Sequence, residues 1–326
     1  MPIGNDVLTD ALTYALDKTG GPNAPVAIIN ATGLETLDAV KTSRNACNKL
    51  PDTLDGVFNT ILVRATRQSA ETLGLVAMAF DHAIPGARIY IAQENSHGAG
   101  GLEKHLARAF PNLQSVVKFK CRTLVLDVDD ARKDQIDRWR GDAQIRKVKH
   151  NRGEFWSAPG VFSWDRPDPA SVLLLGVLPV SMPGNIADLG CGNGLLTGAL
   201  AKKADAVEVW ALDADSLSVA CCRRNIEDRA PAIPVHVLWR DATGENTDLP
   251  PMDYVVMNPP FHTQQAEDRA LGQAFCESAL KMLKTGGQLY LVANRHMPYE
   301  AILENASAKV TLLDDRDGFK LIRAIK

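Results

Sequence analysis

A glycine-rich loop between an expected strand and an expected helix constrains the fold of this chain more than any other feature. Residues 188–194 have the sequence Asp-Leu-Gly-Cys-Gly-Asn-Gly, after the apolar run 186–189 and before the amphipathic stretch 195–203. Glycines at alternate positions permit a tight turn and remove the Cβ atoms that would keep a nucleoside away from the backbone. The loop therefore predicts an α/β sheet that binds a nucleoside-type ligand at the carboxyl end of a strand.

The spacing of the glycines favours S-adenosylmethionine (SAM) over NAD as that ligand. A pyrophosphate-binding loop has the pattern G-x-G-x-x-G. In this chain Gly190, Gly192 and Gly194 are evenly spaced, and Asp188 precedes them. A carboxylate there is poorly placed for a pyrophosphate, but it can hold the loop or, through water, contact the ammonium group of a methionine moiety. Cys191 fits because this position of the loop requires only a small side chain.

Two further acidic residues follow successive strands of the same series. Asp213 ends the run 207–212, where a carboxylate can accept both hydroxyls of a ribose. Asp241 follows the run 235–239 and can accept from an adenine amine, with Ala242 adding backbone contacts. Each acid alone is typical of a strand-end cap, but all of them in this order favour a cofactor site. We interpret Asp215 as a helix N-cap.

The stretch Asn258-Pro259-Pro260-Phe261, after the apolar run 254–257, predicts the catalytic residues. An aromatic amine is a poor nucleophile because its lone pair is delocalised. If the side-chain oxygen of Asn258 and the carbonyl of Pro259 each accept one N–H, the lone pair can point at a methyl donor and positive charge on nitrogen is stabilised. Phe261 would stack on the base, and His262 would hydrogen-bond the substrate rather than act as a base.

Short β-branched runs alternate with amphipathic stretches in both halves of the chain, which is typical of wound α/β sheets. In the first half we expect strands at 26–29, 60–63 and 88–92 and helices at 70–83 and 102–110. In the second half we expect strands at 186–189, 207–212, 235–239, 254–257 and 289–293, helices at 168–182, 195–203, 216–228, 266–284 and 298–305, and a closing hairpin of 310–313 with 320–325. The first half has no glycine cluster after its first strand, so we expect no nucleotide site there. Residues 98–101 predict a helix-entry turn.

Composition describes a soluble globular protein. The chain has 326 residues, which suits two domains, and its 45% apolar content, 23% charged content and net charge of −3 exclude disorder as the main state. The six cysteines form no C-x-x-C pair and no zinc-like spacing with histidine, so we expect reduced thiols, no disulfides and no metal. We predict a cytoplasmic protein with neither a signal peptide nor a membrane span.

The stretch 137–156 is more basic than the rest and includes two tryptophans. Arginine and lysine beside exposed tryptophan suit phosphate contact and base stacking, so we predict that Arg146, Lys147 and Lys149 bind nucleic acid. A solvated basic edge anchored by its tryptophans is an equally open interpretation. The Pro- and Gly-rich residues 158–169 then mark a domain boundary, and they could close over the cofactor.

Across its whole length the chain resembles the RsmC/RlmG-type ribosomal RNA guanine-N2 methyltransferases. The similarity is carried by residues 160–163 (Gly-Val-Phe-Ser), 188–194, 258–262 (Asn-Pro-Pro-Phe-His), 292–294 and 298–299. The family often has Asp-x-Gly-Ser after Gly-Val-Phe-Ser, where this chain has Asp-Pro-Ala-Ser at 168–171. We count Phe162 among the expected substrate contacts.

The resemblance implies two tandem Rossmann-like class I methyltransferase domains. We expect a degenerate RNA-positioning domain at 1–150, a linker at 151–170 that closes over the cofactor, and a catalytic domain at 171–326 with a seven-stranded sheet and an antiparallel terminal strand. The implied function is SAM-dependent methylation of the N2 amine of a guanosine in 16S ribosomal RNA, by a monomer acting on ribosomal RNA or the small subunit. Guanine-N2 methylation of 23S RNA, glutamine-N5 methylation of a protein and a non-catalytic RNA-binding assembly role remain alternatives.

Overall fold

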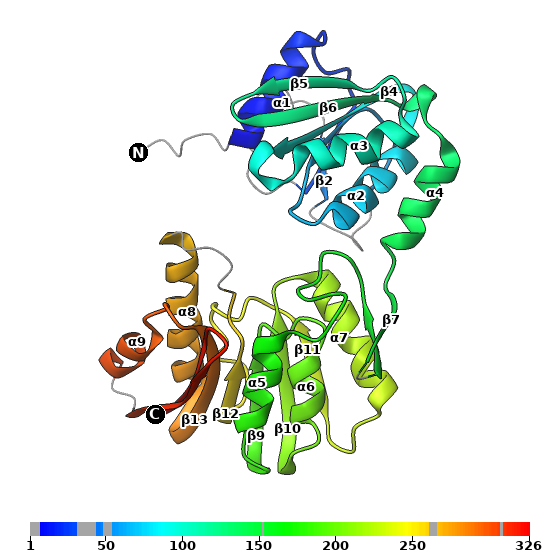
Figure 1. Cartoon of the computed structure of the whole chain (residues 1–326). Coiled ribbons are helices and arrows are strands. Elements are labelled where there is room, and N and C mark those ends of the chain that lie inside the picture. The colour runs from blue at the N-terminus through cyan, green and yellow to red at the C-terminus, as the bar shows by residue number, and fades with distance from the viewer. Residues whose placement is uncertain (1–6, 31–43, 48–53, 152, 261–265, 307–308) are drawn as a thin grey trace. The chain divides into compact units, whose positions relative to one another are not determined.

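The chain divides into two compact units, Met1–Gln144 and Ile145–Lys326 (Figure 1). The computed structural model describes residues 7–30, 44–47, 54–151, 153–260, 266–306 and 309–326, with the side chains of 44–47 and 266–269 excepted. Across these ranges, none of the helices combines the length and the apolarity that a membrane crossing requires.

Unit 1 is built on a six-stranded sheet with the order β2-β1-β3-β4-β6-β5. Its strands are β1 Val26–Ile29, β2 Arg44–Cys47, β3 Phe58–Arg64, β4 Ala83–Glu94, β5 Gln114–Lys118 and β6 Cys121–Asp127. Strands β2, β1, β3 and β4 are parallel, whereas β6 runs antiparallel to both β4 and β5. The predicted strands at 26–29, 60–63 and 88–92 are confirmed as parts of β1, β3 and β4.

Helices cover both faces of this sheet. They are α1 Val7–Lys18, α2 Ser69–Asp81, α3 Ala99–Ala109 and α4 Lys133–Asp142, with short 3-10 turns η2 Asn95–His97 and η3 Val128–Asp130. Leu12 and Leu16 of α1 pack against one face, and apolar residues of α2, α3 and α4 pack against the other. The predicted helices at 70–83 and 102–110 correspond to α2 and α3. The helix-entry turn is also confirmed, since Gly98 lies just before α3 with φ +88°.

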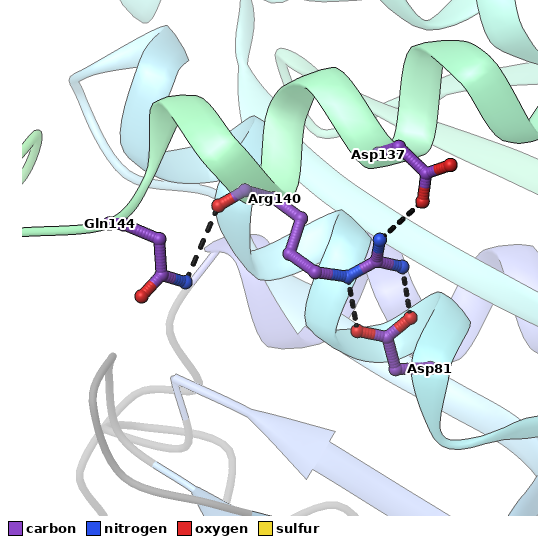
Figure 2. A network of polar contacts seen from close by, with 4 residues as sticks. All are labelled: Asp81, Asp137, Arg140 and Gln144. Atoms are coloured by element: carbon purple, nitrogen blue, oxygen red, sulfur yellow. Dashed lines mark hydrogen bonds and ion pairs between the residues drawn. The ribbon is translucent and has the colours of Figure 1, made fainter.

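A partly exposed ion network attaches α4, the last element of unit 1, to α2 (Figure 2). The guanidinium of Arg140 donates two parallel hydrogen bonds to the carboxylate of Asp81, one of them 2.8 Å long from Nε, and a third to Asp137. Hydrogen bonds to these carboxylates, to Asp81 foremost, raise the pKa of Arg140 further above its ordinary value. The positive charge of Arg140 therefore stabilises the packing of α4 on α2.

Unit 2 contains a seven-stranded sheet with the order β11-β10-β9-β12-β13-β15-β14. Its strands are β9 Ser181–Leu189, β10 Ala204–Asp213, β11 Val235–Trp239, β12 Met252–Met257, β13 Leu283–Asn294, β14 Lys309–Arg316 and β15 Phe319–Ile325. The first five in this order are parallel, and β15 is antiparallel to β13 and β14. The predicted seven-stranded sheet with an antiparallel terminal strand is confirmed.

The helices of unit 2 form two layers around the sheet (Figure 1). They are α5 Pro169–Val177, α6 Leu195–Leu200, α7 Ser216–Arg229, α8 Ala266–Met282 and α9 Tyr299–Asn305. Apolar residues of α5, α6 and α7 pack on one face, and those of α8 and α9 on the other. The prediction that the first helix runs to residue 182 is wrong. It ends at Val177 because Pro179 disfavours helical dihedrals at Leu178, whose ψ is 139°.

A hairpin of β7 Arg146–His150 and β8 Gly153–Ser157 precedes the sheet of unit 2. The backbone N–H of Trp156 donates to Asn225 of α7 over 2.7 Å, and its indole Nε1 donates to Asp228 over 3.0 Å. Because these bonds attach the hairpin to α7, β7 lies in the second unit. The predicted domain border at residue 150 therefore differs from the border between the compact units, which follows Gln144.

Candidate active site

A cavity of about 400 Å³ lies at the carboxyl ends of the central strands of unit 2. Its wall contains these residues of the predicted site: Phe162, Gly190, Gly192, Asp213, Asp241, Ala242, Asn258, Pro259 and Pro260. A small second pocket shares Phe162, Gly190, Gly192 and Asn258 with it and adds Asp168, Ser171 and Cys191. Residues 261–265 lie outside the described ranges, so the predictions for Phe261 and His262 stay predictions.

The glycine loop begins where β9 ends. Gly190, Gly192 and Gly194 all have positive φ, at +75°, +54° and +83°. The backbone N–H groups of Gly190 and Cys191 donate to the carbonyl of Leu212 over 2.9 and 3.0 Å, which holds the loop against β10. A Cβ at Gly194 would lie 2.7 Å from the sulfur of Cys222, so the loop requires glycine there for space as well as for φ.

Asp213, at the end of β10, joins the loop to the next helix. One carboxylate oxygen accepts from the N–H of Gly192 over 2.8 Å, and the other accepts from the N–H of Asp215 over 2.9 Å. A carboxylate has about four acceptor sites, and Asp213 lies in the cavity wall. Asp215 accepts from Ser218 at the start of α7, which confirms that it is the N-cap.

Asp241 and Ala242 form a turn after β11 that other side chains hold in place. The Oδ1 atom of Asp241 accepts from the N–H and the hydroxyl of Thr243 over 2.8 and 2.7 Å. The carbonyl of Ala242 accepts from the buried hydroxyl of Ser278 over 2.6 Å and from the amide of Asn246 over 3.3 Å. These bonds present one carboxylate edge and the backbone of the turn to the cavity.

Asp188 lies beneath the loop and is fully buried, with 0% exposure. Its Oδ2 accepts from the Thr197 hydroxyl of α6 over 2.6 Å, and its Oδ1 has no hydrogen-bond partner among the described residues. Burial raises the pKa of Asp188 to about 7, although the bond from Thr197 acts in the opposite direction and Asp213 adds a like charge. A carboxyl group with a pKa of about 7 thus lies directly beneath the glycine loop.

Asn258, which follows β12, has a fixed side chain. Its Nδ2 donates to Oδ2 of Asp168 over 2.8 Å and to the hydroxyl of Ser171 over 2.8 Å. The same Asp168 oxygen accepts from the N–H of Ser171 over 2.7 Å and so caps α5. Pro259 and Pro260 continue the cavity wall beside Asn258.

Asp168 and Ser171 are therefore site residues that the sequence analysis did not identify. A sequence motif could have identified both residues, because the segment 168–171 corresponds to the Asp-x-Gly-Ser of the similar family. The Asp and the Ser stand at the same spacing, and only the Gly is replaced, by Ala170. Since Ala170 is buried in the α5 core and the other two side chains contact Asn258, the substitution leaves both contacts in place.

The basic stretch predicted to bind nucleic acid is split between α4 of unit 1 and the hairpin of unit 2. Lys147 forms an ion pair with Asp228 at 2.9 Å, which raises its pKa. Arg146 lies with its Cζ 5.7 Å from the ring centroid of Trp164. Lys149 is exposed and forms no ion pair with any described residue. The positive charge available to a ligand is therefore smaller than the sequence suggests.

The described cysteines are Cys121, Cys191, Cys221, Cys222 and Cys276, and all are buried thiols outside any disulfide. A hydrogen bond with Cys222, together with burial, raises the pKa of the Cys191 thiol, which makes it a poor nucleophile. Within the described ranges, no cluster of three His, Cys, Asp or Glu residues is suited to hold a metal ion. Cys191 thus has a packing role in the loop.

Comparison with known proteins agrees with this geometry. The methyltransferase small domain family matches residues 152–323. Several relatives carry the name ribosomal RNA small subunit methyltransferase C, and two of them illustrate the similarity. The protein from Shewanella pealeana is 27% identical over 83% of this chain and 79% of its own length, and the protein from Hahella chejuensis is 30% identical over 78% and 72%.

A solved structure has a similar fold over both units. It is the T. thermophilus 16S rRNA N2 G1207 methyltransferase (RsmC) in complex with AdoMet and guanosine, with a TM-score of 0.80 and 23% identity over 99% of this chain and 92% of that one. This likeness supports the two-domain α/β methyltransferase fold. By the family match and the relatives together, the chain belongs to the methyltransferase small domain family and to the small-subunit ribosomal RNA methyltransferases C.

Proposed function

We propose that this protein transfers a methyl group from SAM to the exocyclic N2 amine of a guanosine in 16S ribosomal RNA. The observation that carries the proposal is one cavity whose wall contains a glycine loop, two strand-end carboxylates and the Asn258-Pro259-Pro260 segment. The names of the relatives support ribosomal RNA of the small subunit as the substrate. The T. thermophilus neighbour, described with AdoMet and guanosine, supports the cofactor and the target base.

The residues of the cavity fit SAM. Its volume of about 400 Å³ lies within the usual range for small-molecule sites. Gly190 and Gly192 leave the backbone open to the ligand, Asp213 offers acceptors to ribose hydroxyls, and Asp241 offers a carboxylate edge to the adenine amine. Asp188 contributes a negative charge close to the loop once it is ionised, which suits a cationic ligand.

The methyl transfer needs little proton chemistry from the protein. When bound, SAM would supply an electrophilic methyl group on its sulfonium, and the bonding electron pair would stay on sulfur. Asn258 Oδ1 and the Pro259 carbonyl accept the two N–H bonds of the amine, so that its lone pair points at the methyl group. The new N–C bond makes the nitrogen cationic, these oxygens stabilise that charge, and the extra proton leaves to water.

The target amine must leave the RNA helix to reach Asn258. The N2 amine of guanine is held by base pairing in a duplex, so the nucleotide has to be unstacked and turned into the cavity, as other base-modifying enzymes do. We assign RNA positioning to unit 1 and to the hairpin of unit 2, where Arg146 and Lys149 carry the positive charge and Phe162, 40% exposed, lies at the cavity wall. A ribosomal RNA substrate also implies a cytoplasmic location.

The proposal is tested by supplying SAM with a labelled methyl group and separately offering 30S subunits, 50S subunits, free ribosomal RNA and total protein. Nucleoside analysis of labelled RNA is expected to yield N2-methylguanosine from 30S material, and Asn258→Ala, with a strongly reduced rate, serves as the matched control. Label in 50S RNA would show that the target guanosine belongs to the large subunit. Label in glutamine would show that the substrate is a protein and would refute the proposal. Tight SAM binding with no labelled product would favour a non-catalytic RNA-binding role.

A further inference from the structure

The side-chain amide of Asn258 is held by two residues of a segment far from it in the sequence. Asp168 Oδ2 and the Ser171 hydroxyl each lie 2.8 Å from Nδ2, so both amide protons have partners. Asp168 precedes Asn258 by 90 residues and belongs to the start of α5. The contact therefore forms only when α5 and β12 pack in the folded unit.

These bonds determine which way the amide faces. An amide turned by 180° would direct Oδ1 at the carboxylate of Asp168, which would set two acceptors against each other. The carboxylate therefore excludes the turned orientation, and Oδ1 is the atom left for the cavity, whose wall Asn258 lines. Because the reacting amine requires an acceptor and not a donor from Asn258, only this orientation is productive.

The negative charge of Asp168 has a second effect on the same amide. A hydrogen bond from an amide N–H to a carboxylate is charge-assisted, and it draws electron density through the conjugated amide toward the oxygen. Oδ1 thus becomes a stronger acceptor for a nitrogen that is acquiring positive charge. A carboxylate that orients and polarises a metal-binding histidine acts on its ligand in a related way.

We propose that Asp168 is a positioning residue for methyl transfer, which selects the productive orientation of Asn258 and strengthens its Oδ1 as an acceptor. Ser171 assists by occupying the second amide proton. The inference rests on the proposed function, because it concerns the same reacting amine. It assigns to the first turn of α5 a role beyond helix capping.

The decisive variant is Asp168→Asn, since asparagine caps a helix as well as aspartate does and can still accept from Ser171 and Asn258. Only the negative charge is lost. We expect kcat on 30S subunits to fall about tenfold, which corresponds to about 1.4 kcal/mol. We expect KM for 30S subunits, Kd for SAM and Tm to stay at wild-type values. Ser171→Ala, the matched control, should lower kcat less, because it removes a neutral partner of the amide.

A double-mutant cycle separates positioning from general structural support. In an Asn258→Ala background, Asp168→Asn should change the residual rate by less than twofold, because its effect passes through the missing amide. An effect of equal size in both backgrounds, or a kcat for Asp168→Asn equal to that of the wild type, would overturn the inference. If the wild type itself leaves 30S RNA unlabelled, the proposed function has failed instead.

Hydrogen exchange of the Asn258 side-chain amide tests the inference without any substrate, even if the proposed function fails. In protein labelled with nitrogen-15 asparagine, the two Nδ2 protons of Asn258 should exchange slowly with solvent. Asp168→Ala should speed that exchange at least tenfold and leave the exchange of core amides unchanged. Equally fast Nδ2 exchange in the wild type and the variant would show that Asp168 does not hold the amide, and it would refute the inference.

Discussion

Replacing Asp188 by Asn is expected to change how stability depends on pH. In the unfolded chain Asp188 titrates at its ordinary pKa of 3.8, whereas in the folded protein burial raises the pKa to about 7. Between these values the folded state holds a proton that the unfolded state has released. The contribution of this group is therefore fully present below pH 4 and is lost as pH rises to about 7.

The magnitude follows from the two pKa values. Since one pKa unit corresponds to about 1.4 kcal/mol, the interval from 3.8 to about 7 amounts to about 4 kcal/mol at most. Asp188→Asn removes this titration and keeps the shape of the side chain. The free energy of unfolding of both SAM-free proteins is measured in urea at pH 5, 6, 7 and 8. The variant should become more stable relative to the wild type as pH rises, and the difference should be constant above pH 7.

The pH dependence of SAM binding should also reflect the ionisation of Asp188. A ligand with sulfonium and ammonium charges favours the ionised form of Asp188, so binding below pH 7 should release a proton. Calorimetry in buffers of different ionisation enthalpy is expected to show about one proton released at pH 6 and an affinity about tenfold below the plateau reached near pH 8. Asp188→Asn should bind more weakly with no such pH dependence. An unchanged pH dependence in the variant would refute the assignment to Asp188.

Further predictions concern the catalytic amide, the loop and the helix network. Asn258→Ala should lower kcat about 10²- to 10³-fold while SAM affinity, measured by calorimetry, is retained; equal loss of SAM binding would contradict its role. Gly194→Ala places a Cβ 2.7 Å from Cys222 Sγ at a φ of +83°, so it should weaken SAM binding and lower Tm, and wild-type affinity would be inconsistent with the loop geometry. Arg140→Ala removes the bonds to Asp81 and should cost less than about 1 kcal/mol in urea unfolding, because the pair is partly exposed, with SAM affinity unchanged.

The sequence predicts central parallel strands such as β1 because they are buried on both faces and therefore require an apolar run. β12 Met252–Met257 contains the predicted run 254–257, and the glycine loop follows β9 as expected. The end of a helix is harder to predict when a single residue determines it. The end of α5 is set by Pro179, and the run of leucines before it led the prediction to continue the helix past this proline.

Contacts between distant segments could not be predicted from local pattern. The bond between Asp168 and Asn258 depends on how α5 packs beside β12, and neither segment alone indicates the other. The partners of the basic residues depend on folding in the same way. Arg140 and Lys147 are close in the sequence, but they lie in different compact units and each is paired with a carboxylate of its own unit, Asp81 and Asp228. Charge counted along the chain therefore overstated the charge offered to a ligand.

The sheets of the two units share one strand order. Without β11, the sheet of unit 2 has the order β10-β9-β12-β13-β15-β14, and unit 1 repeats it as β2-β1-β3-β4-β6-β5 with the same antiparallel end.

The strand ends of the two sheets differ in what they hold. In unit 1, Asn30 follows β1 and donates to the carbonyl of Arg64 over 3.0 Å, while Gln93 of β4 donates to Thr66 over 3.0 Å and to His97 over 2.9 Å. The unit's own amide side chains thus bridge the strand ends where unit 2 has a glycine loop, strand-end carboxylates and Asn258. Because amide side chains already form internal hydrogen bonds at these strand ends of unit 1, the described part of that unit agrees with the proposed assignment of SAM binding to unit 2.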